Sequence, residues 1–166
     1  GNVMTDFSYE KLSTDRSKCN LSYAAPVGLL LECNHVYNQY VFLTNPGETL
    51  RRFEKQSRNM RSLARYSRAN QVNSEWIENF LHDTYDKGLV PVCCSCNVFA
   101  WSDDRHELKR IKNDVGSQLA LMECKPRHNV TDIPSLFWAA IPGNEGDFPA
   151  EDFFHTFLEQ AVCSVS

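Results

Sequence analysis

The stretch from Leu89 to Trp101, which reads LVPVCCSCNVFAW, organises the fold. It is rich in β-branched, aromatic and cysteine side chains and shows no helical period. Such a composition predicts a buried strand.

On the N-terminal side, residues 1–26 are polar and turn-rich, which predicts a flexible leading arm. Apolar residues over 27–44 predict two strands, or one long bent strand, interrupted near 34–38. A turn at 45–47 then opens a helix over about 48–68. We expect a second helix that is capped by Asn73 and ended by Gly88.

On the C-terminal side, Ser102 is predicted to cap a helix whose first turn is favoured by acidic residues at 103 and 104. Residues 120–125 should return as a strand. Asp132 and Pro134 begin a short helix, which the Pro-Gly pair at 142–143 ends. Pro149 is placed in the first turn of a last helix, where its missing amide hydrogen costs nothing.

This order of elements predicts an α+β fold with an antiparallel sheet and helices on one face. The middle of the chain is expected to be ferredoxin-like, with helices added at the C-terminus. A chain of 166 residues can bury about 70% of its unfolded surface around one core. We therefore expect a single domain over 27–166.

Charge and cysteine content limit the class of protein. The net charge of −4, from 17 basic and 21 acidic residues, is too small to indicate a polyanion partner for the whole surface. No apolar run approaches the roughly 18 to 20 residues of a membrane helix, and no export signal opens the chain. Seven cysteines, an odd number, favour reduced thiols and a cytoplasmic location.

The strongest binding signal is the helix expected over 48–68. Its apolar seam is narrow, and its other faces carry a local excess of cations that the whole chain lacks. Nucleic acid, anionic lipid or an acidic protein patch could meet this surface, although acidic residues elsewhere in the fold could also neutralise it. The candidate partner-binding residues are Arg51, Lys55, Arg58, Arg61, Arg65 and Arg68.

The cysteine cluster at 93–96 does not predict a metal site. Successive side chains alternate on a strand, so Cys94 and Cys96 point one way and Cys93 points the other. Tetrahedral zinc needs four converging ligands, commonly from a Cys-x-x-Cys knuckle on a turn, whereas Cys93 and Cys96 have this spacing on a predicted strand that points them to opposite faces. We expect buried free thiols that behave as small hydrophobic side chains, and no bound metal.

Catalysis by these residues is not expected. The five histidines are scattered, and none lies in a recognisable nucleophile motif. None of the seven glycines belongs to a phosphate-binding loop, so no nucleotide cofactor is expected. The chain begins on Gly1 and stops soon after an apolar segment, from which we expect a piece of a longer protein.

Several stretches resemble the TraG-type conjugation ATPases of Bacteroides conjugative transposons. The stretches are Glu32 to Tyr40, Ser62-Leu63 with Tyr66 to Arg68, Asn79 to Leu81, Asn97-Val98, Phe137 to Asn144, Asp147 to Pro149, Phe154 with Thr156-Phe157, and Glu159 to Cys163. The similarity covers most of the chain, and its specificity lies in the order and spacing of these stretches. They resemble the region that precedes the ATPase motor of that family.

The resemblance implies a large cytoplasmic ATPase of a type IV secretion apparatus, oligomeric at the inner face of the bacterial inner membrane. ATP and magnesium are implied for that parent protein alone, because the ATP-binding residues of the family have no counterparts here. The expected function is a non-catalytic domain that presents docking surfaces to other secretion components. Two alternatives remain open: a separate nucleic-acid-binding module that uses residues 48–68, and a small thiol enzyme.

Overall fold

The computed structural model describes residues 3–9, 23–124 and 126–163, and it divides the chain into two compact units. We call residues 1–42, 93–156 and 160–166 the sheet unit, and residues 43–92 and 157–159 the hairpin unit. The sequence predicted one domain over 27–166. The division arises because the two helices between the second and third strands build a core of their own.

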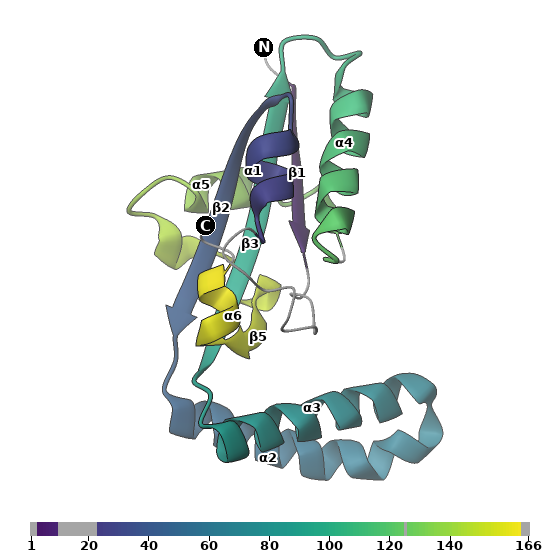
Figure 1. Ribbon diagram of the computed structural model, residues 1–166, viewed down its shortest axis with the longest axis vertical. Coiled ribbons are helices and arrows are strands. Elements are labelled where there is room, and N and C mark those ends of the chain that lie inside the picture. Colours follow the sequence, from purple (N-terminus) through teal and green to yellow (C-terminus); the bar gives the residue numbers. More distant parts are fainter. Residues whose placement is uncertain (1–2, 10–22, 125, 164–166) are drawn as a thin grey trace. The chain divides into compact units, whose positions relative to one another are not determined.

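Strand β3 (Pro91–Ser102) is the central strand of a five-stranded sheet whose main order is β2-β3-β1-β4. Strand β1 (Val3–Tyr9) pairs antiparallel with β3, so that Val3 lies opposite Ser102. Strand β4 (Pro126–Asn129) pairs antiparallel with the other edge of β1. Strand β2 (Asn34–Leu43) lies beside β3 and runs in the opposite direction (Figure 1). Strand β5 (Phe154–Phe157) also pairs with β3.

The connections make the sheet unit ferredoxin-like. Helix α1 (Ala25–Leu30) joins β1 to β2, and helix α4 (Leu108–Leu121) joins β3 to β4. Read from β4, the strand order is 4-1-3-2, and the chain order is β-α-β-β-α-β with two helices inserted between β2 and β3. The prediction of an α+β fold is confirmed.

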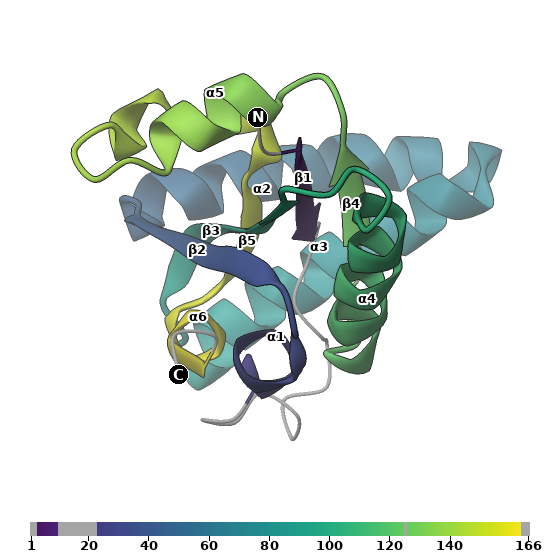
Figure 2. The ribbon, with the colours of Figure 1, turned by 90° about the horizontal axis from the view of Figure 1, so that it is seen from above.

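Alternating side chains of β3 serve two cores. Cys96, Val98 and Ala100 pack with residues of α1 and α4, among them Val27 and Val115. Phe99 points to the other face, as the period of two along a strand requires. There it packs with residues of β2, α5 (Ile133–Ala139) and the following loop, namely Tyr40, Leu136, Ala139 and Phe148. Helices α1 and α4 thus share one face, while α5 covers the opposite face (Figure 2).

The hairpin unit consists of α2 (Pro46–Leu63), a 3₁₀ turn η1 (Ala64–Tyr66) and α3 (Arg68–Lys87). The Asn45 side chain caps α2 by accepting bonds from the amides of Gly47 and Glu48. Gly88 ends α3 in the left-handed conformation with φ 64°, as predicted. The unit's core contains Phe53, Ile77, Phe80, Leu89 and Phe157, with the rings of Phe80 and Phe157 stacked 4.7 Å apart.

Helix α3 begins at Arg68, six residues earlier than the predicted cap at Asn73 implies. Ser67 caps it instead, because its hydroxyl accepts a bond of 3.1 Å from the amide of Asn70. Asn73 consequently lies inside the helix. Several residues in this part of the sequence can cap a helix. Ser67 is the cap because the 3₁₀ turn η1 ends at Tyr66 and α3 begins directly after Ser67.

The N-terminal predictions differ from the structure in two places. Residues 3–9, assigned to the leading arm, form β1, while residues 10–22 lie outside the described part of the chain. Residues 25–30 form α1 instead of part of a strand, and Val27 is fully buried. Residues 3–9 form a strand because they pair with β3, and the local sequence has no period that would predict such pairing.

The C-terminal predictions also need correction. A strand was predicted over 120–125, but α4 continues to Leu121 and residues 122–124 are not a strand either. Leu119 and Met122 remain in the core that α4 shares with the sheet, and residue 125 lies outside the described part of the chain. Pro149 precedes only a short 3₁₀ turn, η3 (Ala150–Asp152), after a similar turn, η2 (Glu145–Asp147). Strand β5 follows, since Phe153 and Phe154 pack into the cores on opposite faces of the sheet, and α6 (Leu158–Cys163) comes last.

Candidate functional site

The basic face of α2 is formed by Arg51, Lys55 and Arg58, which recur at intervals of four and three residues. This spacing places them on one side of the helix, opposite the buried side chains of Phe53 and Ser57. All three cations are exposed, and none forms an ion pair with any residue that the structure describes. We refer to these three residues as the basic stripe.

The other three predicted partner-binding residues are arranged differently. Arg61 donates from Nε to Glu78 of α3 over 2.8 Å, so its charge is partly neutralised within the hairpin. Arg65 bonds the Tyr66 hydroxyl at 2.8 Å and lies over the Tyr66 ring. Arg68 begins α3 and is exposed. Among the described residues, the basic stripe and Arg68 are therefore the members of this set without an ion pair or a side-chain hydrogen bond.

A second candidate is an apolar groove in the sheet unit, beneath α5. Its volume is about 330 Å³. The floor is formed by β1, β2 and β3, and the wall by α5 and the residues after it. The lining residues are Met4, Val36, Phe99, Trp101, Phe137, Ala140 and Ile141.

Around this groove, large apolar side chains of α5 and of the residues after it are exposed. Phe137 is 47% exposed, Trp138 53% and Ile141 41%. Trp138 is held by a bond of 2.9 Å from its indole nitrogen to Asp147. The chain then turns at Gly143, whose φ of 100° is a conformation that glycine adopts without strain. The stretch from Phe137 to Asn144 therefore forms a structured rim.

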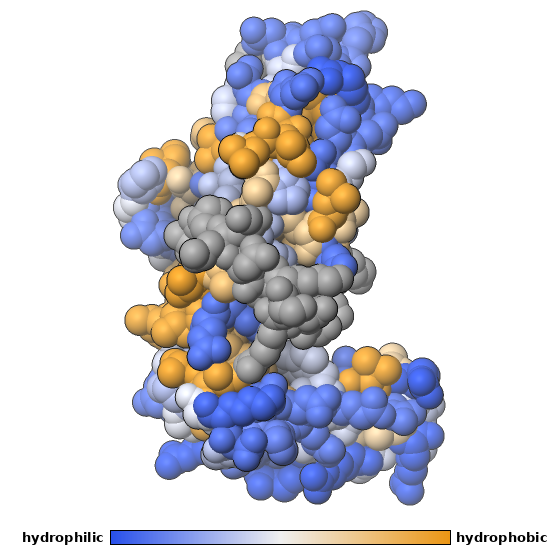
Figure 3. Space-filling model, viewed as in Figure 1, coloured by the Kyte–Doolittle hydropathy of each residue, from blue (hydrophilic) through white to orange (hydrophobic). Residues whose placement is uncertain are grey.

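Apolar surface also lies over α1, where the side chains of Leu29 and Leu30 are exposed (Figure 3). The other side of this short helix is buried through Val27. Single exposed leucines are ordinary on protein surfaces, so this patch is weaker evidence for a binding site than the groove.

A contact between a thiol and an imidazole was not predicted from the sequence. The Cys93 sulfur of β3 lies 3.3 Å from Nδ1 and 4.0 Å from Nε2 of His155 on β5. The two residues are 62 positions apart in the chain, and both are partly buried. The pairing of β5 with β3 brings them together, and no motif signalled it.

The neighbouring thiols have different environments. Cys94 and Cys96 are fully buried on the face opposite Cys93, as the alternation of strand side chains predicted. Burial raises the pKa of Cys94 to about 12, and the nearby thiols Cys96 and Cys93 add to the shift. The pKa of Cys33 is also raised, first by burial and then by the Asp114 carboxylate. No cluster of three or more potential metal ligands occurs among the described residues.

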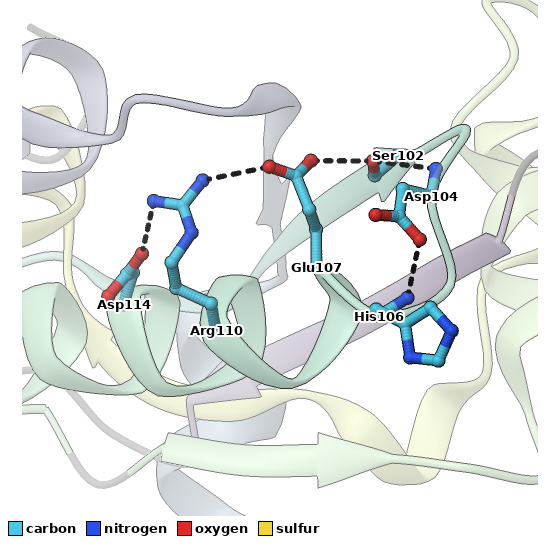
Figure 4. Close-up of polar contacts among 6 residues, drawn as sticks. All are labelled: Ser102, Asp104, His106, Glu107, Arg110 and Asp114. Carbon is cyan, nitrogen blue, oxygen red and sulfur yellow. Dashed lines mark hydrogen bonds and ion pairs between the residues drawn. The ribbon is translucent and has the colours of Figure 1, made fainter.

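The acidic residues after β3 belong to a polar network in the turn between β3 and α4 and on the first turns of α4. The Ser102 hydroxyl accepts a bond from the Asp104 amide and donates one of 2.9 Å to Glu107, while Asp104 accepts from the His106 amide (Figure 4). Arg110 links Glu107 to Asp114 through contacts of 3.4 Å (Figure 4). The predicted cap at Ser102 is wrong, because α4 begins at Leu108 and its N-cap residue is Glu107. The Ser102 hydroxyl instead holds the turn that precedes the helix, and these carboxylates have a structural explanation.

Within the described part of the chain, no helix is both long and apolar enough to cross a membrane. No protein-family model matches the sequence, and no curated protein matches it. The resemblance to conjugation ATPases therefore stays a prediction.

Proposed function

We propose that this chain is a non-catalytic domain of a TraG-type conjugation ATPase that docks onto other components of a type IV secretion apparatus. The observation that carries the proposal is the apolar groove beneath α5. Its volume lies at the lower end of the range for ligand pockets, which suits a few aliphatic or aromatic side chains of a partner segment. The expected occupant is an apolar segment of another secretion component.

The groove and the sequence resemblance involve the same residues. Phe137, Ala140 and Ile141 line the groove and belong to the stretch from Phe137 to Asn144 that resembles the family. Exposed aromatic and aliphatic side chains next to a concave surface are typical of protein interfaces, because their burial releases water from apolar area. In this proposal ATP and magnesium bind elsewhere in an oligomeric parent protein at the inner membrane.

The test is competition in living donor cells. The chain is expressed in a Bacteroides donor that carries a conjugative transposon, and the transfer frequency is measured. If the chain occupies the docking partner of the full-length ATPase, transfer falls. The variant Ile141→Asp places a charge in the groove and should restore transfer, because a carboxylate desolvated by the partner is unfavourable.

The matched control is Leu121→Asp, which introduces the same charge at an exposed apolar position of α4 that does not line the groove. This variant should inhibit transfer as the unchanged chain does. Circular dichroism establishes that both variants fold. Equal inhibition by Ile141→Asp, or no inhibition by the unchanged chain, contradicts the proposal.

A second candidate function is nucleic-acid binding, which the basic stripe favours. Three exposed cations without carboxylate partners on one helical face can contact phosphates. Tyr66 is the exposed aromatic closest to them in sequence, and base stacking by one ring gives little affinity. For a docking domain we expect only weak DNA binding that is lost as salt is raised.

Charge reversal of Arg51, Lys55 and Arg58 separates the two functions. These residues are preferable to Arg61 and Arg65, because changing the latter would also disturb contacts within the hairpin. If nucleic-acid binding is the function, the chain binds DNA tightly at physiological salt and the triple variant does not. Such a result, measured by fluorescence anisotropy, would favour this second candidate.

A further inference from the structure

The Cys93 thiol of β3 lies next to the imidazole of His155 on β5. A distance of 3.3 Å between the sulfur and Nδ1 is within hydrogen-bonding range for sulfur. An imidazole in this position can take the thiol proton and hold the resulting thiolate through a charge-assisted hydrogen bond. The thiolate is the nucleophilic form of cysteine, so this geometry favours reaction at Cys93.

Reaction at the neighbouring thiols is disfavoured by their burial. Cys94 and Cys96 lie on the opposite face of β3 and are inaccessible to solvent. The raised pKa values of Cys94 and Cys33 keep both groups in the unreactive thiol form at neutral pH. Cys93 is partly exposed, as are Cys33 and Cys163.

Polar atoms continue along the face of β3 that carries Cys93. Ser95 and Asn97 follow at intervals of two residues and therefore point to the same side. The Ser95 hydroxyl and the Asn97 amide nitrogen are buried, and neither has a hydrogen-bond partner among the described residues. Buried polar atoms are normally paired, so the Ser95 hydroxyl, two residues from Cys93 on the same face of the strand, has unused hydrogen-bonding capacity.

We propose that Cys93 is a site of covalent modification by small peptide disulfides, with His155 as its positioning and proton-accepting residue. The Cys93 thiolate attacks one sulfur of the disulfide, a new S–S bond forms, and the other sulfur leaves as a thiolate. That thiolate takes up the proton held by His155. One thiol and one disulfide are consumed, and one mixed disulfide and one thiol are formed.

The probe is glutathione disulfide, applied to the folded chain and followed by peptide mass spectrometry over time. We expect the adduct at Cys93 before any at the other described cysteines. His155→Gln should slow its formation by about tenfold or more, because the thiolate loses its proton acceptor and cationic partner. His35→Gln is the control, since the His35 ring contacts the Cys33 carbonyl oxygen and no thiol in the described contacts. It should leave the rate at Cys93 unchanged.

Two results would overturn the proposal: an adduct at Cys93 no faster than at the other cysteines, or an unchanged rate in folded His155→Gln. If that variant does not fold, the pH dependence of the unchanged chain decides. Between about pH 8.5 and pH 6.5 the rate at Cys93 should fall less in the folded chain than in the urea-denatured chain, where the pair is absent. Equal declines in both states would refute the role of His155.

Discussion

Asn97 is a fully buried amide in the middle of a sheet core. Its side-chain oxygen accepts a bond of 3.0 Å from the amide of Asn38 on the adjacent strand β2. Such a cross-strand bond satisfies an acceptor that water cannot reach. The pair therefore stabilises the register between β2 and β3 as well as the core.

Replacing Asn38 with alanine should lower the free energy of unfolding by about 1–3 kcal/mol, because the buried Asn97 oxygen is left without a donor. Urea denaturation followed by circular dichroism measures the change. Asn34→Ala is the matched control on the same strand, since Asn34 is exposed, and it should shift stability by less than about 0.5 kcal/mol. Equal effects of the two substitutions would show that the bond contributes nothing.

Cys94 makes stability depend on pH in the alkaline range. Burial raises the pKa of its thiol from 9.0 to about 12, so only the unfolded chain ionises between these values. The unfolded state then binds fewer protons than the folded state, and stability falls as pH rises above 9.0. The loss from this group is at most about 1.4 kcal/mol per pH unit.

The measurement compares urea denaturation of the unchanged chain and of Cys94→Ala from about pH 8 to pH 10.5. Cys94→Ala is expected to be less stable at neutral pH, because it leaves a small cavity, and to lose stability less steeply above pH 9. Identical slopes in the two proteins would mean that the Cys94 thiol ionises in the folded state as easily as in the unfolded one.

Two glycines occupy different positions in their helices, one at the end of α3 and one inside α4. Gly88 ends α3 with φ 64°, a conformation that costs a residue with a Cβ atom about 1–2 kcal/mol. Gly116 lies inside α4, and a Cβ atom built on it would meet nothing within 4 Å. The same substitution should therefore have opposite effects at the two positions.

Gly88→Ala should lower the melting temperature, and Gly116→Ala should raise it, with a gain of about 0.5–1 kcal/mol from the better helix former. Differential scanning calorimetry of both variants provides the comparison. A stabilised Gly88→Ala would show that α3 does not end in the left-handed conformation.

The whole molecule consists of two compact units with separate cores, and its sequence contains no phosphate-binding glycine loop. If it is a docking domain, magnesium and ATP should leave its melting temperature unchanged. Binding of ATP at 100 times its Kd would add about 2.7 kcal/mol to stability and raise the melting temperature by several degrees. Scanning fluorimetry with magnesium alone as the reference distinguishes the two results, and a clear rise would refute the non-catalytic assignment.

Much of the architecture could be predicted because burial leaves a periodic trace in the sequence. The buried strand at 91–102, the opposite orientations of Cys93 and Cys94 and the left-handed Gly88 all follow from local patterns. The basic stripe was also included in the predicted set of cations. These features depend on residues a few positions apart, whose geometry is set by one helix or strand.

Only the tertiary structure decided which distant residues meet. The pairing of β5 with β3 places His155 beside Cys93, the two-helix hairpin places Glu78 beside Arg61, and α5 closes the groove over Phe99. By itself the sequence determined the α+β class and the faces that are buried. A period shows that one side of an element avoids water, but it does not identify the element that covers that side, because packing depends on the shape of the whole core.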